Sequence, residues 1–304
     1  MDKLLVTGIT GFVGTNLREY LSDRFELIGL TRTPEGTSSF KSYKELTPDD
    51  FDSVKAVIHL AGKSLDPLCE KNPQGYIEAN TVLTQELFDA FLKSDCKVFI
   101  LMSSVKAAAD VVPDALTEAV IPNPKTAFGK SKLAAEQYIL SKLNPQKSVY
   151  ILRPCAIHGP GMHGNFKMLY KLVQKGIPYP LGAFDNQRSF LSVTNLCFAI
   201  EEFLAANANS GIYHIADDMP ISTNRLIALM EQGLGKKVKV LRVPKNLIRA
   251  AAKMGDFIPL PLSTKSLSKL TENYVVSNKK IKLALGKEFP LSTEEGILKT
   301  IDSL

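Results

Sequence analysis

The sequence lacks any apolar run near the roughly 20 residues that a helix needs to cross a bilayer, which excludes a spanning helix. Its first residues lack the basic leader and apolar region of an export signal, so we expect a cytoplasmic protein. Internal repeats, low-complexity tracts and disordered linkers are also missing. What remains is a 304-residue chain with 45% apolar residues, a composition that is ordinary for a globular protein with a buried core.

Cysteines with metal-binding or redox spacing are absent as well. The chain has four, Cys69, Cys96, Cys155 and Cys197, and they are scattered along its length. Three of them lie in apolar surroundings typical of strands or helices. We therefore expect reduced, small core residues and no metal site.

Lys and Arg outnumber Asp and Glu by 37 to 31, which gives a formal net charge of +6. Such a charge suits nucleic acid, an anionic membrane or a small anionic ligand, and alone it does not choose among them. Residues 236–253 hold seven basic residues and no acidic one, with apolar residues interleaved. This pattern occurs in membrane-surface and nucleic-acid-binding segments, but more often in a solvated face. Because no nucleic-acid-binding motif accompanies it, we expect no nucleic acid partner.

Apolar and β-branched runs alternate with segments of helical periodicity through the first half of the chain. Strands are predicted at residues 3–6, 25–30, 56–60, 98–102, 149–153 and 211–216, and helices at 16–22, 81–93 and 128–143. This order predicts an α/β fold, a Rossmann-type doubly wound parallel sheet covered on both faces.

Beyond Gly159 the alternation gives way to amphipathic helices separated by Pro- and Gly-bearing loops. We expect a smaller, mostly helical C-terminal part, interleaved with the first because the last strand lies at 211–216. The predicted division assigns residues 1–160 and 189–217 to a dinucleotide-binding domain, and 161–188 and 218–304 to a second ligand-binding domain.

A glycine-rich turn joins the first predicted strand to the first helix. Its spacing is Gly-x-x-Gly-x-x-Gly, one residue longer at the first gap than the ordinary dinucleotide fingerprint. Such glycines allow a tight turn and a close approach to a pyrophosphate, which the helix N-terminus attracts. The candidate cofactor residues here are Gly8, Thr10, Gly11, Phe12, Val13 and Gly14.

Two later strands end at the same carboxyl edge, where open α/β sheets bind ligands. Leu60, Ala61 and Gly62 end one of them, and Pro154 ends another. The second strand lacks the terminal carboxylate that favours NAD and is followed instead by Arg32. Arg32 can pair with a 2′-phosphate, which favours NADP over NAD, or it can stack on adenine without a phosphate preference.

Together these motifs resemble the extended short-chain dehydrogenases/reductases, over nearly the whole chain. In order they are the glycine turn, Leu60-Ala61-Gly62, Ser103-Ser104, Gly129-x-Ser131-Lys132, Arg153-Pro154 and Gly159-Pro160-Gly161. Within that family the chain looks most like the bacterial nucleotide-sugar 4-epimerases and 4-keto reductases of surface-polysaccharide pathways.

The resemblance implies a catalytic set of Ser or Thr, Tyr and Lys, with Tyr and Lys four residues apart on one helix. By position the set is Ser104, Phe128 and Lys132, with Lys132 also holding the cofactor ribose. Phe128 departs from the pattern because phenylalanine has no titratable atom. If it is native, catalysis is slower or uses another proton carrier, such as Ser104, Thr126, Lys106 or water. Otherwise it is an engineered substitution. From residue type alone, Lys132 could instead share a solvated helix face with Glu136.

The resemblance also implies a UDP-sugar substrate and a candidate set of residues around it. They are Lys63, Ser104, Lys106, Asn165, Pro180, Leu181 and Arg188. Arg188 would bind the diphosphate, a role that suits a planar bidentate donor. Relatives often form homodimers through a helix bundle, so a homodimer is a further expectation.

We therefore expect an NAD(P)-dependent enzyme that acts at carbon 4 of a UDP-linked sugar. Because the NAD-type carboxylate is missing, a 4-keto reductase is favoured over the alternative, a UDP-hexose 4-epimerase. A third alternative is a dinucleotide-binding sensor in which Phe128 has silenced turnover.

Overall fold

A parallel sheet of seven strands forms the centre of the computed structural model, which describes residues 1–31, 40–43, 46–64, 70, 72–112, 114–206, 208–256 and 263–304. The strands are β1 (Asp2–Thr7), β2 (Phe25–Thr31), β3 (Phe40–Ser42), β4 (Ala56–His59), β5 (Val98–Met102), β6 (Ser148–Pro154) and β9 (Gly211–Ile215). Their order across the sheet is β3-β2-β1-β4-β5-β6-β9, and each neighbouring pair is parallel. The predicted Rossmann-type sheet is thereby confirmed.

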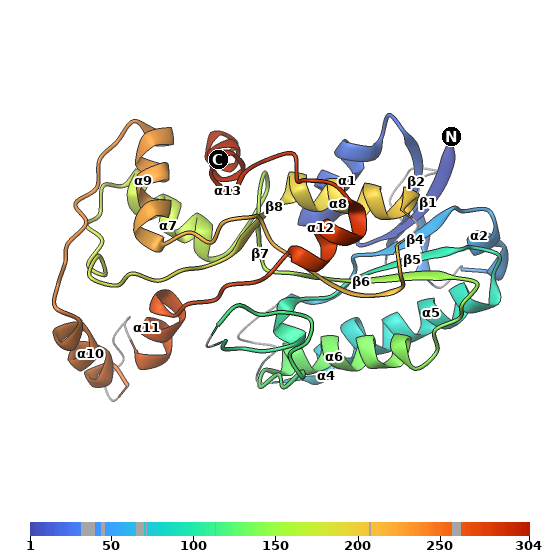
Figure 1. Cartoon of the computed structure of the whole chain (residues 1–304), viewed down its shortest axis with the longest axis horizontal. Coiled ribbons are helices and arrows are strands. Elements are labelled where there is room, and N and C mark those ends of the chain that lie inside the picture. The colour runs from blue at the N-terminus through green and yellow to red at the C-terminus, as the bar shows by residue number, and fades with distance from the viewer. Residues whose placement is uncertain are drawn as a thin grey trace.

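Helices cover both faces of this sheet (Figure 1). On one face lie α1 (Phe12–Leu21), α8 (Val193–Ala205) and α12 (Lys279–Leu285). On the other lie α2 (Pro48–Asp52), α4 (Gln74–Tyr76), α5 (Leu83–Lys93) and α6 (Ala127–Leu140). The sequence of α5 explains its place, because Thr84, Leu87, Phe88 and Phe91 recur at helical spacing and are its buried residues.

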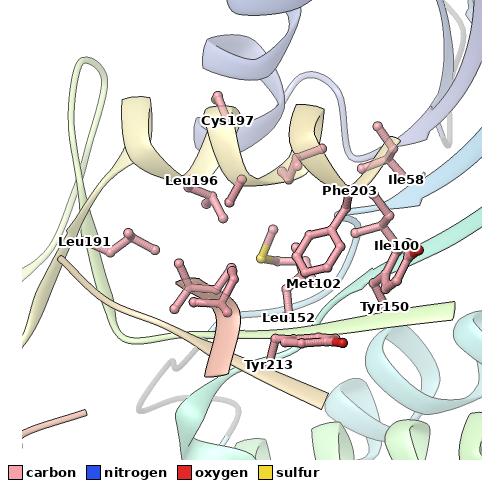
Figure 2. Packing of buried hydrophobic residues seen from close by; sticks show 14 of the residues in the cluster. Ile58, Ile100, Met102, Tyr150, Leu152, Leu191, Leu196, Cys197, Phe203 and Tyr213 are labelled. Carbon is pink, nitrogen blue, oxygen red and sulfur yellow. The ribbon is translucent and has the colours of Figure 1, made fainter. Parts of the chain in front are cut away.

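Each central strand is apolar on both sides, as a sheet between two helical layers requires. Leu4, Val6, Ile58, Ile100 and Leu152 pack against α8 and its neighbours. The alternate residues of the same strands join the core beneath α5. They are Leu5, Val57, Phe99, Leu101 and Ile151. Figure 2 shows the first of these cores, with the ring of Phe203 beside that of Tyr150, at a centroid separation of 4.4 Å.

The remaining elements build a smaller, mostly helical part with a core of its own. They are β7 (Ala156–His158), β8 (Phe190–Ser192), α7 (Asn165–Gln174), α9 (Thr223–Leu234), α10 (Lys245–Met254), α11 (Thr264–Thr271) and α13 (Thr293–Asp302). Strands β7 and β8 pair in parallel apart from the large sheet. Helix α12 instead contacts β9 and α8 of the sheet layer. The division into two domains at the residues given above stays a prediction.

Several elements differ from the sequence-based expectation. Helix α1 begins at Phe12 rather than at residue 16, because the glycine turn leads directly into it. The helix expected at 81–93 starts as a π-helix, η2 (Ile77–Val82), and becomes α-helical at Leu83. A short 3-10 helix, η3 (Val105–Ala107), follows β5.

Within the described residues, no helix is both long and apolar enough to span a bilayer. The same residues contain no group of three or more His, Cys, Asp or Glu side chains placed to hold a metal ion. Cys96, Cys155 and Cys197 are buried free thiols, and burial raises the pKa of each. Cys69 lies outside the described residues.

Candidate active site

The glycine turn between β1 and α1 is closely packed. Gly8 has a φ of 69°, and a β-carbon there would lie 2.7 Å from the Ala61 nitrogen. A β-carbon at Gly14 would lie 2.3 Å from the carbonyl oxygen of Gly8. Gly11 precedes α1 without a side-chain cap, so backbone N–H groups at this helix start can bind an anion. The geometry therefore suits a pyrophosphate next to the turn.

Buried hydrogen bonds fix the end of β4 beside this turn. The Thr7 hydroxyl accepts from the Ala61 N–H at 3.0 Å and lies 2.6 Å from Nδ1 of His59. Nε2 of His59 lies 2.9 Å from the Thr84 hydroxyl. Burial lowers the pKa of His59 to about 3, so the ring is neutral at pH 7. His59 thus anchors the Leu60-Ala61 loop.

Asn80 of η2 links the next residues of that loop to α6. Its Oδ1 accepts from the Lys63 N–H at 2.8 Å, and its Nδ2 donates to the Lys63 carbonyl at 3.1 Å and to the Ser131 hydroxyl at 3.0 Å. A β-carbon at Gly62 would lie 2.5 Å from Asn80 Oδ1 and 3.1 Å from Lys132 Nζ. Glycine at position 62 therefore leaves room for both side chains.

Phe128 and Lys132 lie on the first turns of α6. The Glu70 carboxylate accepts from the Ala127 and Phe128 N–H groups, each at 3.1 Å, and so caps the helix. The Phe128 ring is 7% exposed and contacts the Tyr76 ring at a centroid separation of 5.8 Å. At the position that the resemblance assigns to tyrosine, the helix thus presents a buried aromatic ring without a hydroxyl.

Lys132 is buried, and its Nζ donates to the Met102 carbonyl at 2.9 Å. Burial lowers the pKa of Lys132 to about 8, and the nearby Glu136 charge only partly opposes this effect. At pH 7 the group is therefore still mostly an ammonium, and it gives up its proton more readily than an exposed lysine does.

Glu136, one turn beyond Lys132, forms a buried ion pair with Arg153 of β6. Its side chain is fully buried, and that of Arg153 is 1% exposed. The Arg153 guanidinium donates to both carboxylate oxygens, and the Ser103 hydroxyl donates to one of them. The alternative in which Lys132 and Glu136 share a solvated face is therefore wrong. The only sign of this pair in the sequence is Arg153 itself, a charged residue at the end of a predicted buried strand.

A cleft of about 650 Å³ brings together predicted residues from distant parts of the chain. Those that line it are Phe12, Leu60, Gly62, Lys63, Ser104, Lys106, Phe128, Lys132, Pro154 and Arg188. Six others do not line it but lie in the glycine turn or next to it. They are Gly8, Thr10, Gly11, Val13, Gly14 and Ala61. Arg32 lies outside the described residues, so the choice between NADP and NAD stays a prediction.

Tyr274 also lines the cleft, although no motif in the sequence pointed to it. Its hydroxyl donates to the Ala109 carbonyl at 2.7 Å, and burial raises its pKa. The Lys106 ammonium lies 4.0 Å from the centre of its ring. Main-chain bonds hold Arg188 between Ile221 and Tyr274, and burial lowers the pKa of its guanidinium. Only the tertiary path of the chain brings Tyr274 here, which is why sequence motifs missed it.

A second cavity of about 240 Å³ shares Arg188 with the cleft and extends into the small part. Asn165 and Arg188 are the predicted residues that line it. Pro180 and Leu181 do not line it, and the neighbouring Tyr179 does. Much of the remaining wall is apolar. It includes Met162, Phe166, Leu169, Phe190, Leu226 and Leu270.

The described walls of both cavities carry cations and no carboxylate. Lys63, Lys106, Lys132 and Arg188 supply the fixed positive charge, and Ser104 adds a hydroxyl. Ser104 Oγ accepts from the Lys106 N–H at 3.2 Å, which leaves its own proton available to a ligand. An anionic ligand that carries a carbonyl group fits this charge distribution.

Comparisons with known proteins find similar proteins over most of the chain. A UDP-glucose 4-epimerase of Vibrio cholerae is 27% identical over 98% of this chain and 94% of its own length. A GDP-6-deoxy-D-mannose reductase of Pseudomonas aeruginosa is 26% identical over 82% of this chain and 86% of its own. The crystal structure of a UDP-N-acetylglucosamine 4-epimerase from Bacillus cereus has the same fold, with a TM-score of 0.80 and 19% identity over 99% of this chain and 98% of its own.

The family model named NAD dependent epimerase/dehydratase family matches residues 4–216, which is more than half of the chain. The predictions of an enzyme and of a nicotinamide dinucleotide cofactor are confirmed by this match. The glycine turn, the Leu60–Gly62 loop and Lys132 are the residues that would hold that cofactor. The chain therefore belongs to the NAD dependent epimerase/dehydratase family.

Proposed function

We propose that the protein is an NAD(P)-dependent 4-keto reductase of a UDP-linked sugar, in the synthesis of a surface polysaccharide. The observation that carries the proposal is the arrangement of Ser104, Phe128 and Lys132 on one cleft whose described walls offer proton donors but no carboxylate. Arg188, which also lines the cleft, suits a diphosphate. The two domains of the division given above would then hold cofactor and sugar nucleotide, respectively.

Reduction of a ketone needs a hydride and a proton, and it needs no base. When bound, a reduced nicotinamide supplies the hydride. The Lys132 ammonium and the Ser104 hydroxyl are two of the donors on the cleft wall, and either can pass a proton to the new alkoxide directly or through water. The oxyanion that develops at carbon 4 would also be stabilised by the Lys132 charge.

Epimerisation starts from an alcohol, whose proton must first be removed. Phe128 cannot accept that proton, and the Tyr274 phenol is committed to the Ala109 carbonyl and has a raised pKa. Without a tyrosine hydroxyl, proton transfer is slower in both directions, and an epimerase turnover needs both directions whereas a reductase turnover needs one. The 27% identity with a UDP-glucose 4-epimerase supports the epimerase as the second candidate.

Restoring the hydroxyl with Phe128→Tyr tests the proposal. The two proteins are compared for NADPH and NADH oxidation with UDP-4-keto sugars, and for interconversion of UDP-hexoses. We expect slow reduction by the unchanged chain and a rise of about 10²-fold or more in the variant, because general acid catalysis contributes that much. Tyr76→Phe serves as the control, since it removes the hydroxyl of the neighbouring ring.

Other outcomes are equally informative. Interconversion of UDP-hexoses with a tightly held NAD would favour the epimerase. Cofactor binding without hydride transfer in either protein would overturn the enzymatic proposal for these substrates and favour the sensor.

A further inference from the structure

The excess positive charge of the chain is carried by a single segment, residues 236–253. It has seven basic residues and no acidic one, whereas the rest of the chain has 30 basic and 31 acidic residues. The seven are Lys236, Lys237, Lys239, Arg242, Lys245, Arg249 and Lys253. All are exposed, and none forms an ion pair with another described residue. Elsewhere the two signs nearly cancel, so this concentration is a local feature and not a property of the whole surface.

The first half of the basic segment runs along the outer edge of the small part. Main-chain bonds join it to the neighbouring strand-like stretch, from the Tyr179 N–H to the Lys239 carbonyl at 3.0 Å and from the Leu241 N–H to the Tyr179 carbonyl at 2.8 Å. In Figure 1 it descends from α9 to α10 at the end of the molecule opposite the sheet. The segment is thus fixed in place by the fold, and its basic side chains are exposed.

Helix α10 completes the segment and is covered on only a narrow stripe. Ile248 and Ala252 are its buried residues. Leu247 and Met254 project about 100–160° away around the helix and are 62% and 58% exposed. Ala250 and Ala251, also exposed, lie between them on the same face. One side of the exposed surface of α10 is therefore apolar.

Lys245, Arg249 and Lys253 follow one another at one-turn intervals on the other side of the buried stripe, so the exposed surface of α10 has an apolar side and a basic side. Helices that lie in the interface of an anionic bilayer combine exposed apolar residues with cations. A merely solvated face does not need exposed leucine and methionine. A small phosphate site is disfavoured, because Asp185 and Glu272 share the adjacent cavity with the three cations.

We propose that α10 and the basic stretch before it dock the protein onto an anionic lipid bilayer. Leu247 and Met254 enter the interface, and the seven cations face the lipid headgroups. The docked surface lies near the second cavity, since Tyr179 lines that cavity and bonds to the basic stretch. Helix α11, which contacts α10, contributes Leu270 to the same cavity. This inference does not depend on the reaction proposed above.

Co-sedimentation of the full chain with vesicles tests the docking. The vesicles contain phosphatidylcholine with or without about 30% phosphatidylglycerol. We expect binding only to the anionic vesicles, and weaker binding as salt is added. The triple variant Lys245→Gln, Arg249→Gln, Lys253→Gln should bind about 100-fold more weakly, because each basic residue contributes roughly tenfold or less.

Two further variants separate charge from apolar contact and from folding. The double variant Leu247→Ser, Met254→Ser should weaken binding about tenfold while the charge is unchanged. The control is Lys93→Gln, Lys97→Gln, Lys130→Gln, which removes the same charge from exposed residues in α5, in the turn between α5 and β5, and in α6. It should bind like the unchanged chain.

Three results would overturn the proposal. The first is that the unchanged chain does not bind anionic vesicles. The second is that the control variant loses as much vesicle binding as the triple variant. The third is that a single-stranded oligonucleotide fully displaces the protein from the vesicles while Leu247→Ser, Met254→Ser leaves vesicle binding unchanged. A dimer in size-exclusion chromatography that this double variant dissociates would instead assign the face to a second copy of the chain.

Discussion

Glu136 and Arg153 set the electrostatic surroundings of Lys132 without touching the cleft. The carboxylate lies one helical turn from Lys132 and partly opposes the fall in the Lys132 pKa. Because both partners are buried, the pair has lost its hydration, and its hydrogen bonds must replace it. Ser103 supplies one further bond to the carboxylate.

Glu136→Gln should therefore destabilise the protein strongly. Removing one partner leaves the other charge buried, which costs about 3–5 kcal/mol. Urea unfolding measures the loss. The matched control is Glu294→Gln, which breaks an equally bidentate pair with Arg225 whose side chains are 48% and 50% exposed. That change should cost less than about 1 kcal/mol, and equal losses in the two variants would contradict the argument.

His59 makes stability depend on pH. In the folded protein its pKa is about 3, whereas an unfolded histidine has a pKa near 6.5. Between these values the unfolded state binds the extra proton, so the free energy of unfolding falls as the pH falls through about 6.5. For this residue alone the loss should reach about 2 kcal/mol at pH 5.

The replacement His59→Asn should remove this contribution, and urea unfolding at several pH values between about 7 and 5 measures it. The slope of the free energy of unfolding against pH is compared between the two proteins, because the substitution also changes stability at every pH. His214, whose pKa burial lowers to about 4, keeps its own dependence in both proteins. The exposed His163→Asn is the control, and a slope unchanged by His59→Asn would show that another group titrates.

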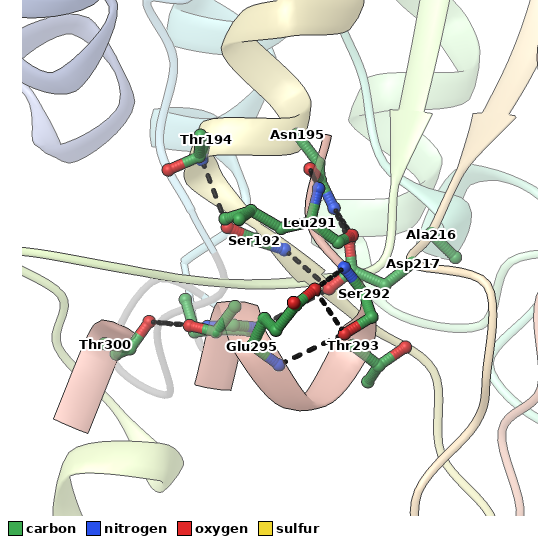
Figure 3. A network of polar contacts seen from close by, with 12 residues as sticks. Ser192, Thr194, Asn195, Ala216, Asp217, Leu291, Ser292, Thr293, Glu295 and Thr300 are labelled. Carbon is green, nitrogen blue, oxygen red and sulfur yellow. Dashed lines mark hydrogen bonds and ion pairs between the residues drawn. The ribbon is translucent and has the colours of Figure 1, made fainter. Parts of the chain in front are cut away.

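At the scale of elements, a polar network holds α13 against the end of β8 and the start of α8 (Figure 3). The Asp217 carboxylate accepts from the Ser192 N–H at 3.0 Å and from Asn195 Nδ2 at 2.7 Å. Asn195 also bonds to the main chain of Leu291, just before α13. Nδ1 of His158, which lines the second cavity, lies 2.8 Å from the Thr300 hydroxyl oxygen. The C-terminal helix thus supports one wall of the second cavity.

Asp217→Ala should loosen this helix. It leaves the buried Ser192 N–H unpaired and removes one bond of Asn195, which together should cost about 2–4 kcal/mol. Asp218→Ala is the matched control, because its partners Asn278 and Lys282 bind a carboxylate that is 41% exposed. Thermal unfolding compares the two, and a loss below about 1 kcal/mol for Asp217→Ala would mean that α13 is held by its apolar contacts alone.

The sequence predicted those helices and strands whose apolar pattern is long enough to distinguish a helix from a strand. Strands such as β5 and β6 are buried on both faces and appear as continuous apolar runs. Strands β7 and β8 have three residues each, too few for any periodicity, and they were missed. The π-helix η2 has no characteristic amino-acid composition that would distinguish it from an α-helix. Asn80 in η2 gains its role only through tertiary contacts.

The same limit applies to the site. Motifs located the residues that lie at strand ends and at the start of α6, because local sequence fixes those positions. Tyr274 reaches the cleft only because the chain returns beside Arg188. Glu136 meets Arg153 only because α6 packs on β6. Residues that depend on such long-range packing leave no pattern in the nearby sequence.

At the scale of the whole molecule, the cleft is shared by the sheet and the small part. Leu60 and Ser104 come from strand ends of the sheet, whereas His163 and Arg188 belong to the segment 161–188. The proposed division predicts two ligands, a dinucleotide at the glycine turn and a sugar nucleotide at Arg188. Each should stabilise the folded state independently by mass action, by about 2.7 kcal/mol at a hundredfold excess over its Kd.

Two variants should therefore have opposite effects on ligand-induced stabilisation. In Gly14→Ala the new β-carbon would lie 2.3 Å from the Gly8 carbonyl oxygen and 2.5 Å from the Ile9 α-carbon, so the turn must distort. NAD(H) or NADP(H) should then no longer raise the melting temperature, while UDP still raises it by about 5 °C. In Arg188→Gln, UDP should no longer raise the melting temperature, while the dinucleotide still does. The substitution removes the charged donor for the diphosphate and leaves the turn intact. Each variant controls for misfolding of the other, and if either loses both shifts, a division into two separate binding regions is wrong.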